Sequence, residues 1–190
     1  MNTSTFRPAS KSDCRTIASL YSISSDGVAD YIWSKLAEPG QDILDVGQHR
    51  YERENTLFSY RNCTLAEVDS AIAGMLVAFP LWADGDDAPE ADPVLAPYSR
   101  LEEDASFYVC GVALFPEYRR LGIGSQFMQQ AEDSCRKQGL EKLSLVVFEQ
   151  NTGAKRLYEA LGYRERSRAA IVPHPLIHLT GDALLMLKQL

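Results

Sequence analysis

Arg119-Arg120-Leu121-Gly122-Ile123-Gly124-Ser125 joins a strand-like run, residues 107–114, to a helix-like run, and this junction decides the predicted fold. Glycine has no β-carbon and tolerates positive φ, so the chain can turn sharply there and approach a ligand closely. The first amides of a helix lack acceptors and carry partial positive charge, which suits phosphate or pyrophosphate. The stretch therefore predicts an anion-binding turn, with a purely structural turn as the alternative. The predicted binding residues are Arg119, Arg120, Leu121, Gly122, Ile123, Gly124 and Ser125.

Two familiar glycine motifs do not fit this turn. A P-loop ends in Gly-Lys-Ser/Thr, whereas Gly124 is followed by Ser125 and Gln126. A dinucleotide-binding fingerprint needs a third glycine at the position where Phe127 stands. The pattern that remains is Arg-x-x-Gly-x-Gly, which is consistent with a different phosphate-bearing ligand.

The segments after the turn show alternating helical and strand patterns. An amphipathic helix ends at Gly139, and residues 143–148 form a short apolar run typical of a buried strand. A second helix begins at Asn151 or Thr152, either of which can cap it, and ends at Gly162. Strand, turn, helix, strand and helix make a βαβ unit with parallel neighbours and the turn at the ligand-binding end of its strand.

The residues of this unit resemble the GNAT superfamily of acyl-CoA-dependent N-acetyltransferases. The resemblance covers residues 107–164, and the flanking regions fit the layout of that superfamily only in outline. It implies an α/β (α+β) fold with a central mixed, mostly antiparallel sheet, a parallel βαβ cofactor-binding unit and flanking helices. The matching stretches are Val112-Ala113-Leu114-Phe115-Pro116-Glu117-Tyr118-Arg119-Arg120-Leu121-Gly122-Ile123-Gly124, Asn151 through Ala154, and Leu157-Tyr158-Glu159-Ala160-Leu161-Gly162-Tyr163.

The resemblance also implies acetyl-CoA as co-substrate, with no metal. The turn would hold the pyrophosphate, while the backbone of Val112, Ala113 and Leu114 would pair with the pantetheine arm and polarise the thioester carbonyl. Asn151 matches the residue that hydrogen-bonds the pantetheine arm, and Tyr158 matches the general acid that protonates the departing thiolate. Without the resemblance, Tyr158 is a residue on the apolar face of its helix.

The general base is open in the sequence. An alkylammonium has a pKa near 10, so the acceptor amine must lose a proton before it attacks. Several relatives carry a glutamate on the fourth strand where this chain has Tyr108, a much weaker base at neutral pH. Glu54, Glu102 and Glu103 are candidates by charge alone, and deprotonation through water is an equal alternative.

Residues outside the unit predict the remaining elements and one wall of an acceptor site. The predicted strands are residues 6–9, 63–68, 71–81, 167–172 and 183–187; the predicted helices follow Ser10 or Ser12 and span residues 28–36. Strands 63–68 and 71–81 form a hairpin at Asp69-Ser70. By analogy with the superfamily, Tyr31 and Trp33 touch the acceptor, with plain core packing as the alternative. His174 and His178 are expected in a loop, in surface or structural roles.

Residues 84–104 are expected to form an acidic insertion. They hold eight acids and one arginine, a balance of −7 that equals the net charge of the whole chain. Pro89, Pro93 and Pro97 favour an extended, solvated and partly disordered loop. A second interpretation is a negative lip that attracts a cationic amine and repels an anionic one. The acids are Asp84, Asp86, Asp87, Glu90, Asp92, Glu102, Glu103 and Asp104.

Length and composition indicate a single domain over residues 1–190, and the resemblance implies that it is an N-acetyltransferase domain. With 45% hydrophobic and 24% charged residues, the composition is typical of a soluble globular protein, and no apolar run is long enough for a membrane helix. Residues 1–7 lack the apolar core of a signal peptide, so none is expected. The four cysteines, Cys14, Cys63, Cys110 and Cys135, make no metal-like cluster and are expected to be reduced core thiols of a cytoplasmic protein. A sequence pI of about 5.0 argues against nucleic acid as a partner. A homodimer through the last strands is a further expectation.

Three functions are consistent with the sequence. The first is acetyl transfer from acetyl-CoA to the primary amine of a small metabolite by direct attack. The second is the same chemistry on a protein N-terminus or lysine, and the third is a non-catalytic acyl-CoA-binding module. An open acceptor groove distinguishes the second from the first, and binding without turnover distinguishes the third.

Overall fold

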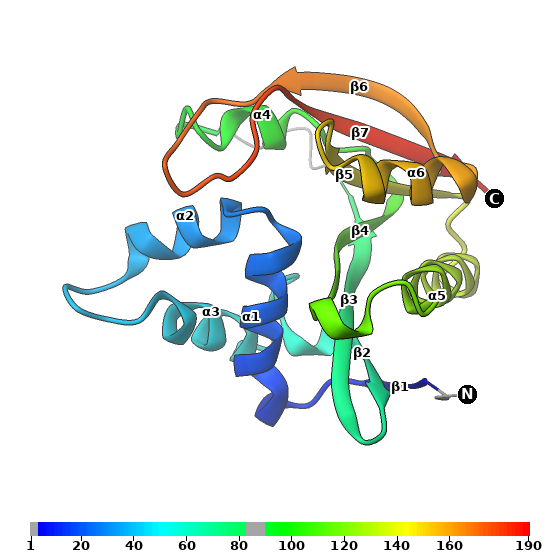
Figure 1. The fold of residues 1–190 in the computed structure, drawn as a ribbon. Helices are drawn as coiled ribbons and strands as arrows, with labels where there is room; N and C mark the ends of the chain where they lie inside the picture. Colours follow the sequence, from blue (N-terminus) through cyan, green and yellow to red (C-terminus); the bar gives the residue numbers. More distant parts are fainter. Residues whose placement is uncertain (1–3, 83–89) are drawn as a thin grey trace. The chain divides into compact units, whose positions relative to one another are not determined.

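The computed structural model describes residues 4–82 and 90–190, which form two compact units. The first unit contains Met1–Ala78 and Gly111–Phe127, and the second contains Phe79–Cys110 and Met128–Leu190. Seven strands form a sheet in the order β1-β2-β3-β4-β5-β7-β6 (Figure 1). Among the strand pairs whose register is described, β4 and β5 are parallel and the others are antiparallel. The predicted mixed, mostly antiparallel sheet with one parallel βαβ pair and flanking helices is confirmed.

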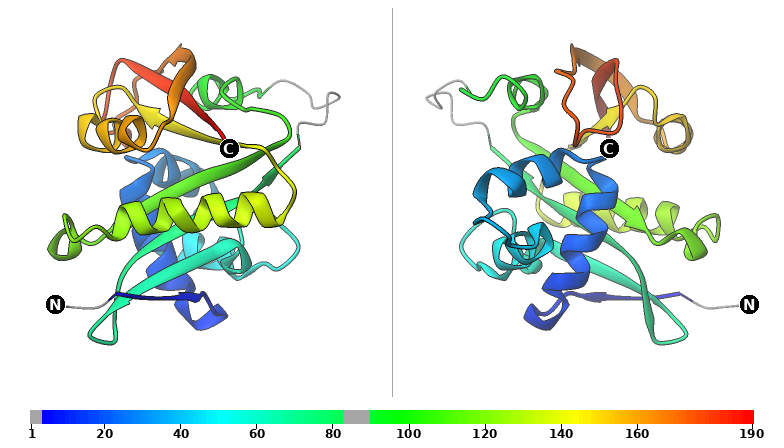
Figure 2. Two further views of the ribbon diagram at one scale, coloured as in Figure 1. Left: turned by 90° about the vertical axis from the view of Figure 1, so that its right-hand side faces the viewer. Right: turned by 60° about the vertical axis from the view of Figure 1, so that its left-hand side comes forward.

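The first unit contains a hairpin and three helices. Both views of Figure 2 show β1 beside the hairpin of β2 and β3. Asp69 and Ser70 both have positive φ, 50° and 66°, which suits the twist of a two-residue hairpin turn; the predicted hairpin is confirmed. The elements are β1 (Thr5–Pro8), η1 (Lys11–Asp13), α1 (Cys14–Ser24), α2 (Val28–Leu36), α3 (Ile43–Glu52), η2 (Tyr60–Asn62), β2 (Cys63–Val68), β3 (Ala71–Leu81, which continues into the second unit) and η3 (Pro116–Tyr118).

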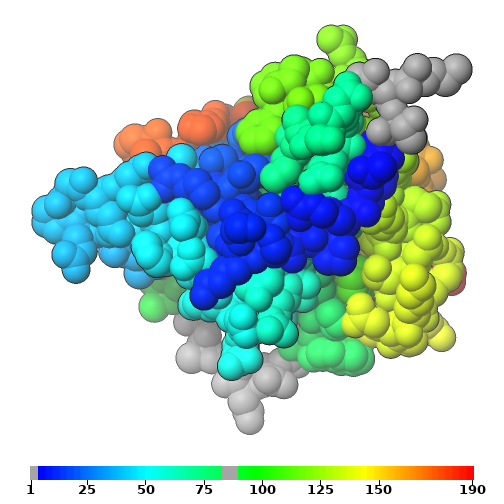
Figure 3. All heavy atoms as spheres, turned by 90° about the horizontal axis from the view of Figure 1, so that it is seen from below, coloured from blue at the N-terminus to red at the C-terminus, as the bar shows by residue number. Residues whose placement is uncertain are grey.

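Helix α3 is absent from the elements predicted from sequence. Its interior Gly47 is a poor helix former, and that weakens the sequence signal. The structure gives the reason for the glycine: a β-carbon at Gly47 would lie 2.8 Å from the Trp33 ring. Trp33 is 1% exposed and Tyr31 is 8% exposed, so both side chains pack in the core. On the face in Figure 3, the blue surface of α1 adjoins the light blue and cyan surface of α2 and α3.

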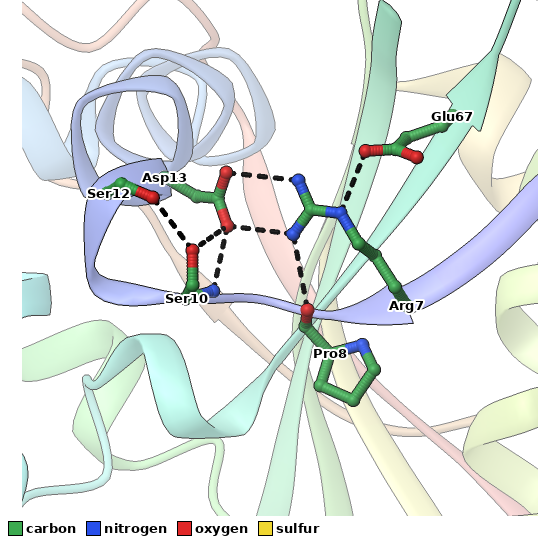
Figure 4. A network of polar contacts seen from close by, with 6 residues as sticks. All are labelled: Arg7, Pro8, Ser10, Ser12, Asp13 and Glu67. Atoms are coloured by element: carbon green, nitrogen blue, oxygen red, sulfur yellow. Dashed lines mark hydrogen bonds and ion pairs between the residues drawn. The ribbon is translucent and has the colours of Figure 1, made fainter. Parts of the chain in front are cut away.

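A polar network joins β1 to the start of α1 and to β2 (Figure 4). The Arg7 guanidinium donates two hydrogen bonds to the Asp13 carboxylate, at 2.8 and 3.1 Å, and a third to Glu67 at 2.7 Å. The Asp13 carboxylate also accepts from the backbone N–H and hydroxyl of Ser10, both at 2.7 Å. Arg7 lowers the pKa of Asp13 to about 2 through these charge-assisted bonds.

The second unit carries the other end of the sheet and the last helices. Figure 1 shows β7 between β5 and β6, and the registers agree. The elements are α4 (Ala96–Ser99), β4 (Ser106–Leu114, which continues into the first unit), α5 (Ile123–Lys137, which begins in the first unit), β5 (Lys142–Phe148), α6 (Thr152–Ala160), β6 (Arg164–Ala170) and β7 (Asp182–Gln189).

The strand predicted at residues 167–172 is wrong in its bounds. Strand β6 begins at Arg164 and ends at Ala170. It is an edge strand with charged, exposed residues on both faces, so its first half shows no apolar alternation. The register also shifts between Glu165 and Ser167, which breaks the period of two there.

The acidic insertion is ordered from residue 90 onward. Residues 84–89 lie outside the described part of the chain. Ala96–Ser99 form a helical turn, and the ring of Tyr98 packs against Phe148 at a centroid distance of 6.0 Å. Leu101 is 1% exposed and Glu103 pairs with Lys142 at 2.5 Å. The expectation of an extended, solvated loop is therefore wrong for residues 90–104, because apolar side chains anchor them.

Candidate functional site

The glycine turn, residues 119–125, contains two backbone positions in the left-handed region. Arg120 has φ of +63° and Gly122 has φ of +81°. Helix α5 begins at Ile123, directly after Gly122. A non-glycine residue in this region is strained, and such strain collects at ligand-binding sites. Gly124 lies within α5, so conformational freedom is required at Gly122 and not at Gly124.

The geometry of the turn fits a diphosphate. A β-carbon at Gly122 would meet no atom within 4 Å, so the main chain there faces open space. The amides that open α5 have no acceptor within the helix and carry its partial positive charge. Ile123 is 1% exposed and anchors the turn, while Arg119, Arg120 and Ser125 are exposed. Backbone amides, two guanidinium groups and open space are together suited to an anion.

Strand β4 offers backbone groups next to this turn. The described β4–β5 ladder ends at the pair of Val109 and Leu145, although β4 continues to Leu114. The Phe115 amide donates to Ala73 of β3 at 3.0 Å, so by alternation the backbone of Ala113 also points toward β3. The amides of Val112 and Leu114 then point to the opposite edge, where an extended ligand can pair with them.

Two further contacts fix this end of β4. A β-carbon at Gly74 of β3 would lie 2.4 Å from the Ala113 carbonyl oxygen, so glycine allows the close approach there. The Arg119 Nε donates to the Leu114 carbonyl at 3.3 Å and ties the glycine turn to the end of β4. Sequence reasoning did not identify Gly74, although an isolated glycine within a strand pattern is its signal.

Asn151 is the N-cap of α6, so of the two caps predicted from the sequence, Asn151 and Thr152, the first is confirmed. Its Oδ1 accepts a hydrogen bond from the backbone N–H of Ala154 at 3.2 Å. This bond fixes the side-chain amide, because Oδ1 is then the acceptor and Nδ2 carries both hydrogens. Among the residues that the structure describes, no acceptor bonds to Nδ2. The residue therefore presents a fixed donor that suits a carbonyl oxygen of a ligand.

Tyr158 lies near the end of α6 and is almost fully buried. It is 8% exposed, and burial raises the pKa of its phenol to about 12. Its ring contacts that of Tyr163 at a centroid distance of 5.9 Å. A phenol with this pKa keeps its proton at neutral pH, so Tyr158 is suited to donate a proton and not to accept one.

Most side chains that are candidates for the general base already form hydrogen bonds or ion pairs, or are buried. Glu54 accepts hydrogen bonds from Tyr60 and Arg61, which lower the pKa of its carboxyl, and Glu103 is paired with Lys142. Burial raises the pKa of Tyr108 well above its usual value, so even less of this phenol is deprotonated at neutral pH and able to act as a base. The negative charge of Glu102 also acts on Tyr108, so these contacts single out no base, and Glu102 and water stay alternatives.

The predicted site residues divide between the two units. The first unit brings together Val112, Ala113 and Leu114 with the glycine turn, residues 119–125. The second unit carries Asn151 and Tyr158 on one helix, α6. Within residues 4–82 and 90–190 the structure shows no group of three or more His, Cys, Asp or Glu that could hold a metal. No helix in the described part of the chain combines the length and apolar character needed to cross a membrane.

A family profile covers most of the chain, including the predicted site residues. The profile described as "Acetyltransferase (GNAT) family" matches residues 28–163. The chain is 36% identical over 64 residues to YycN, an uncharacterized N-acetyltransferase of Bacillus subtilis (strain 168). These 64 residues are 34% of this chain and 40% of YycN. It is 37% identical over 54 residues to the [ribosomal protein bS18]-alanine N-acetyltransferase of Escherichia coli (strain K12), or 28% of this chain and 36% of that enzyme. The chain thus matches less than half the length of these two curated relatives.

A solved structure extends the comparison to the whole chain. The structure of yncA, an acetyltransferase from Salmonella typhimurium with its cofactor acetyl-CoA, has a TM-score of 0.61. The match covers 98% of this chain and 94% of that chain at 18% sequence identity. At this identity, the likeness shows the fold alone.

Proposed function

The chain belongs to the acetyltransferase (GNAT) family, and on this premise we propose that it transfers an acetyl group from acetyl-CoA to the primary amine of a small metabolite. The observation that carries the proposal is that an open, left-handed glycine turn lies next to the part of β4 beyond its described pairing with β5. A diphosphate carrier with an extended amide-bearing arm fits both features, and acetyl-CoA has both parts.

Each site residue has a binding role that its geometry suits. The amides of residues 119–125 hold the pyrophosphate, with Arg119 and Arg120 adding charge. The amides of Val112 and Leu114 pair with the pantetheine arm, and Ala113 holds the strand against β3. Asn151 donates its Nδ2 hydrogens to a carbonyl oxygen of the same arm. When bound, acetyl-CoA supplies an acetyl group activated as a thioester.

The reaction requires stabilisation of one charge and three proton transfers. A β4 amide stabilises the negative charge that develops on the carbonyl oxygen as the amine nitrogen bonds to carbon. The ammonium form of the acceptor gives one proton to water or to Glu102 before it attacks, and the nitrogen gives up a second proton to water as the amide forms. Tyr158 donates its phenolic proton to the sulfur as the carbon–sulfur bond breaks, and the electron pair of its O–H bond stays on the phenol oxygen.

Two acceptor classes and one non-catalytic function are candidates. The similarity to the [ribosomal protein bS18]-alanine N-acetyltransferase of Escherichia coli supports a protein N-terminus as the second candidate, with lysine as a variant of it. A small amine is the first candidate, and a non-catalytic acyl-CoA-binding module is the third. We place the reaction in the cytoplasm, with no metal, no nucleic acid and no membrane partner, in a single domain over residues 1–190. A homodimer through the last strands accompanies this proposal.

A thiol-release assay tests the proposal. The protein is mixed with acetyl-CoA and each member of a panel of small amines, polyamines and N-terminal peptides, and free CoA thiol is measured over time. Release that depends on a small amine supports the first candidate, and release that depends on a peptide supports the second. Acetyl-CoA should also raise the melting temperature by mass action, whereas NAD and ATP should not do so comparably. Binding with no release on any acceptor would leave the non-catalytic module.

A further inference from the structure

The end of α6 is closed by a Schellman motif that brings two tyrosines together. Gly162 has φ of +95°, its N–H donates to Glu159 at 3.1 Å, and the Tyr163 N–H donates to the Tyr158 carbonyl at 3.0 Å. In this motif the residue after the glycine characteristically makes an apolar contact with the helix residue five positions earlier. The contact between the Tyr158 and Tyr163 rings, with 58° between their planes, is that contact.

The motif explains the ring of Tyr163 but not its hydroxyl. Tyr163 is 0% exposed, and its phenol oxygen is buried with no hydrogen-bond partner among the described residues. A phenylalanine would supply the same ring without leaving a polar atom unpaired. A buried hydroxyl without a partner destabilises the folded state, so its presence requires a role beyond packing.

The charged groups around Tyr163 already have partners. Glu132 and Cys135 of α5 face it, and Glu132, 6% exposed, forms an ion pair with Lys188 of β7. The Cys135 thiol donates to the Leu140 carbonyl at 3.3 Å. Two further cations are occupied: Arg136 lies 3.8 Å from Glu132, and Arg164 donates to the backbone carbonyl of Tyr163 at 2.9 Å. The other facing group is the phenol of Tyr158.

We propose that Tyr163 is a positioning residue for Tyr158, and that its hydroxyl donates a hydrogen bond to the Tyr158 oxygen when that oxygen becomes a phenolate. The inference rests on the proposed function. As Tyr158 protonates the sulfur, its O–H bond breaks, an S–H bond forms and a negative charge appears on a buried oxygen. Tyr163 keeps its own proton and stabilises that charge. The two hydroxyls are not hydrogen-bonded in the resting protein, where the neutral Tyr158 oxygen is the weaker acceptor. The phenolate accepts a charge-assisted hydrogen bond about twice as strong, so the bond forms as the charge develops.

The substitution Tyr163→Phe separates this role from packing. It keeps the ring and the Schellman contact, so the melting temperature is expected to stay the same or to rise. Turnover is expected to fall roughly tenfold to hundredfold, the value of a hydrogen bond to a charged group, with KM for acetyl-CoA unchanged. A purely structural role for the hydroxyl predicts the reverse, a lower melting temperature with unchanged kcat, and that result would overturn the inference.

A double-mutant cycle with Tyr158→Phe supplies the second measurement. Without the Tyr158 phenol no phenolate forms, so Tyr163→Phe should cause no further loss of kcat in the Tyr158→Phe background. An equal loss in both backgrounds would show that Tyr163 acts elsewhere and overturn the inference, while the proposed function stands. A wild-type protein without turnover, or a Tyr158→Phe variant as active as wild type, would overturn the proposed role of Tyr158 and this inference with it.

Discussion

The glycine turn of the first unit and helix α6 of the second unit serve one proposed ligand by different chemical means. Residues 119–125 offer main-chain amides, and the exposed side chain of Leu121, 54% exposed, has no part in that role. In the proposed function, helix α6 acts through the side-chain amide of Asn151 and the phenol of Tyr158. The turn therefore depends on backbone conformation, and the helix depends on residue identity.

This difference teaches where each part is sensitive to change. A main-chain site fails when φ and ψ change, so its weak point is Gly122 at φ of +81°. A side-chain site fails when one functional atom is removed, even if the backbone does not move. Substitutions that alter only one of these properties can test whether the comparison holds.

Tyr158→Phe is expected to have the largest effect. It removes one oxygen from α6 and leaves the ring that contacts Tyr163. Loss of a general acid lowers kcat by about 100-fold to 10,000-fold, whereas the Kd for CoA should change little. Steady-state kinetics with an acceptor from the panel, together with calorimetric CoA binding, measure the two quantities. Equal losses in kcat and affinity would show that Tyr158 binds the ligand and does not donate the proton.

The pH dependence of the wild-type enzyme sharpens the same point. Since burial raises the pKa of Tyr158 to about 12, its phenol should keep its proton through neutral and mildly alkaline pH. We therefore expect no alkaline loss of kcat from this group below about pH 10, the usual pKa of tyrosine. A fall in kcat near pH 8 that is abolished by Tyr158→Phe would contradict the assignment.

Gly122→Ala is expected to have the second largest effect, this time on affinity. The added β-carbon forces an L side chain into the left-handed region, which costs about 1–2 kcal/mol, and it occupies the open space over the turn. The Kd for CoA should rise roughly 10-fold to 100-fold, as isothermal titration would show. The maximal kcat at saturating acetyl-CoA should stay close to that of wild type.

Gly139→Ala is the matched control for this substitution. Gly139 follows α5 with φ of +72°, and a β-carbon there would also meet no atom within 4 Å. The backbone strain is therefore similar, but Gly139 lies outside the glycine turn. Both variants should lose similar stability, and Gly122→Ala alone should lose affinity for CoA. Intact CoA binding in Gly122→Ala would refute the assignment of the turn.

The Arg7–Asp13 network is a polar cluster with a structural role only, and it is expected to affect stability without affecting catalysis. Arg7 holds the pKa of Asp13 at about 2 in the folded protein, below the unfolded value of about 3.9. The network therefore stabilises the fold above pH about 4, and that stabilisation, about 1–2 kcal/mol, is lost as the pH falls from about 4 to 2. Urea unfolding at several pH values measures it. Asp13→Asn should flatten this dependence and leave kcat at pH 7 unchanged; a matching drop in kcat would show that the network also serves the site.

The sequence carries the glycine turn and the βαβ unit because both are written in local patterns. Gly122, Gly139 and Gly162 mark positions of positive φ, and the apolar run at residues 143–148 marks a buried strand. The predicted helix after Asn151 is confirmed, since its cap is a local hydrogen bond to Ala154. Features that depend on neighbours close in the sequence are those that one sequence predicts well.

Features that depend on distant neighbours are not predictable in this way. Helix α3 contains Gly47, and a glycine stands there because the ring of Trp33, on another helix, leaves no room for a β-carbon. The lack of a hydrogen-bond partner for the Tyr163 hydroxyl among the described residues depends on which groups of α5 and α6 lie around it. Residue type alone also does not show that Glu54 and Glu103 are already engaged by cations. Packing in three dimensions decides all of these.

Asn151 allows the finest test, because two substitutions separate its two roles. Asn151→Asp keeps an oxygen that can cap α6 through the Ala154 amide but removes the Nδ2 donor, whereas Asn151→Ala removes both. Asp should leave the melting temperature near that of wild type, and Ala should lower the stability by about 1 kcal/mol. Both should weaken CoA binding by about 3-fold to 10-fold, the value of one hydrogen bond. If the Asn151→Asp variant binds CoA as tightly as the wild-type protein does, Nδ2 makes no contact with the ligand. Helix α6 would then contribute main-chain groups, as the glycine turn does, and no side-chain contact from Asn151.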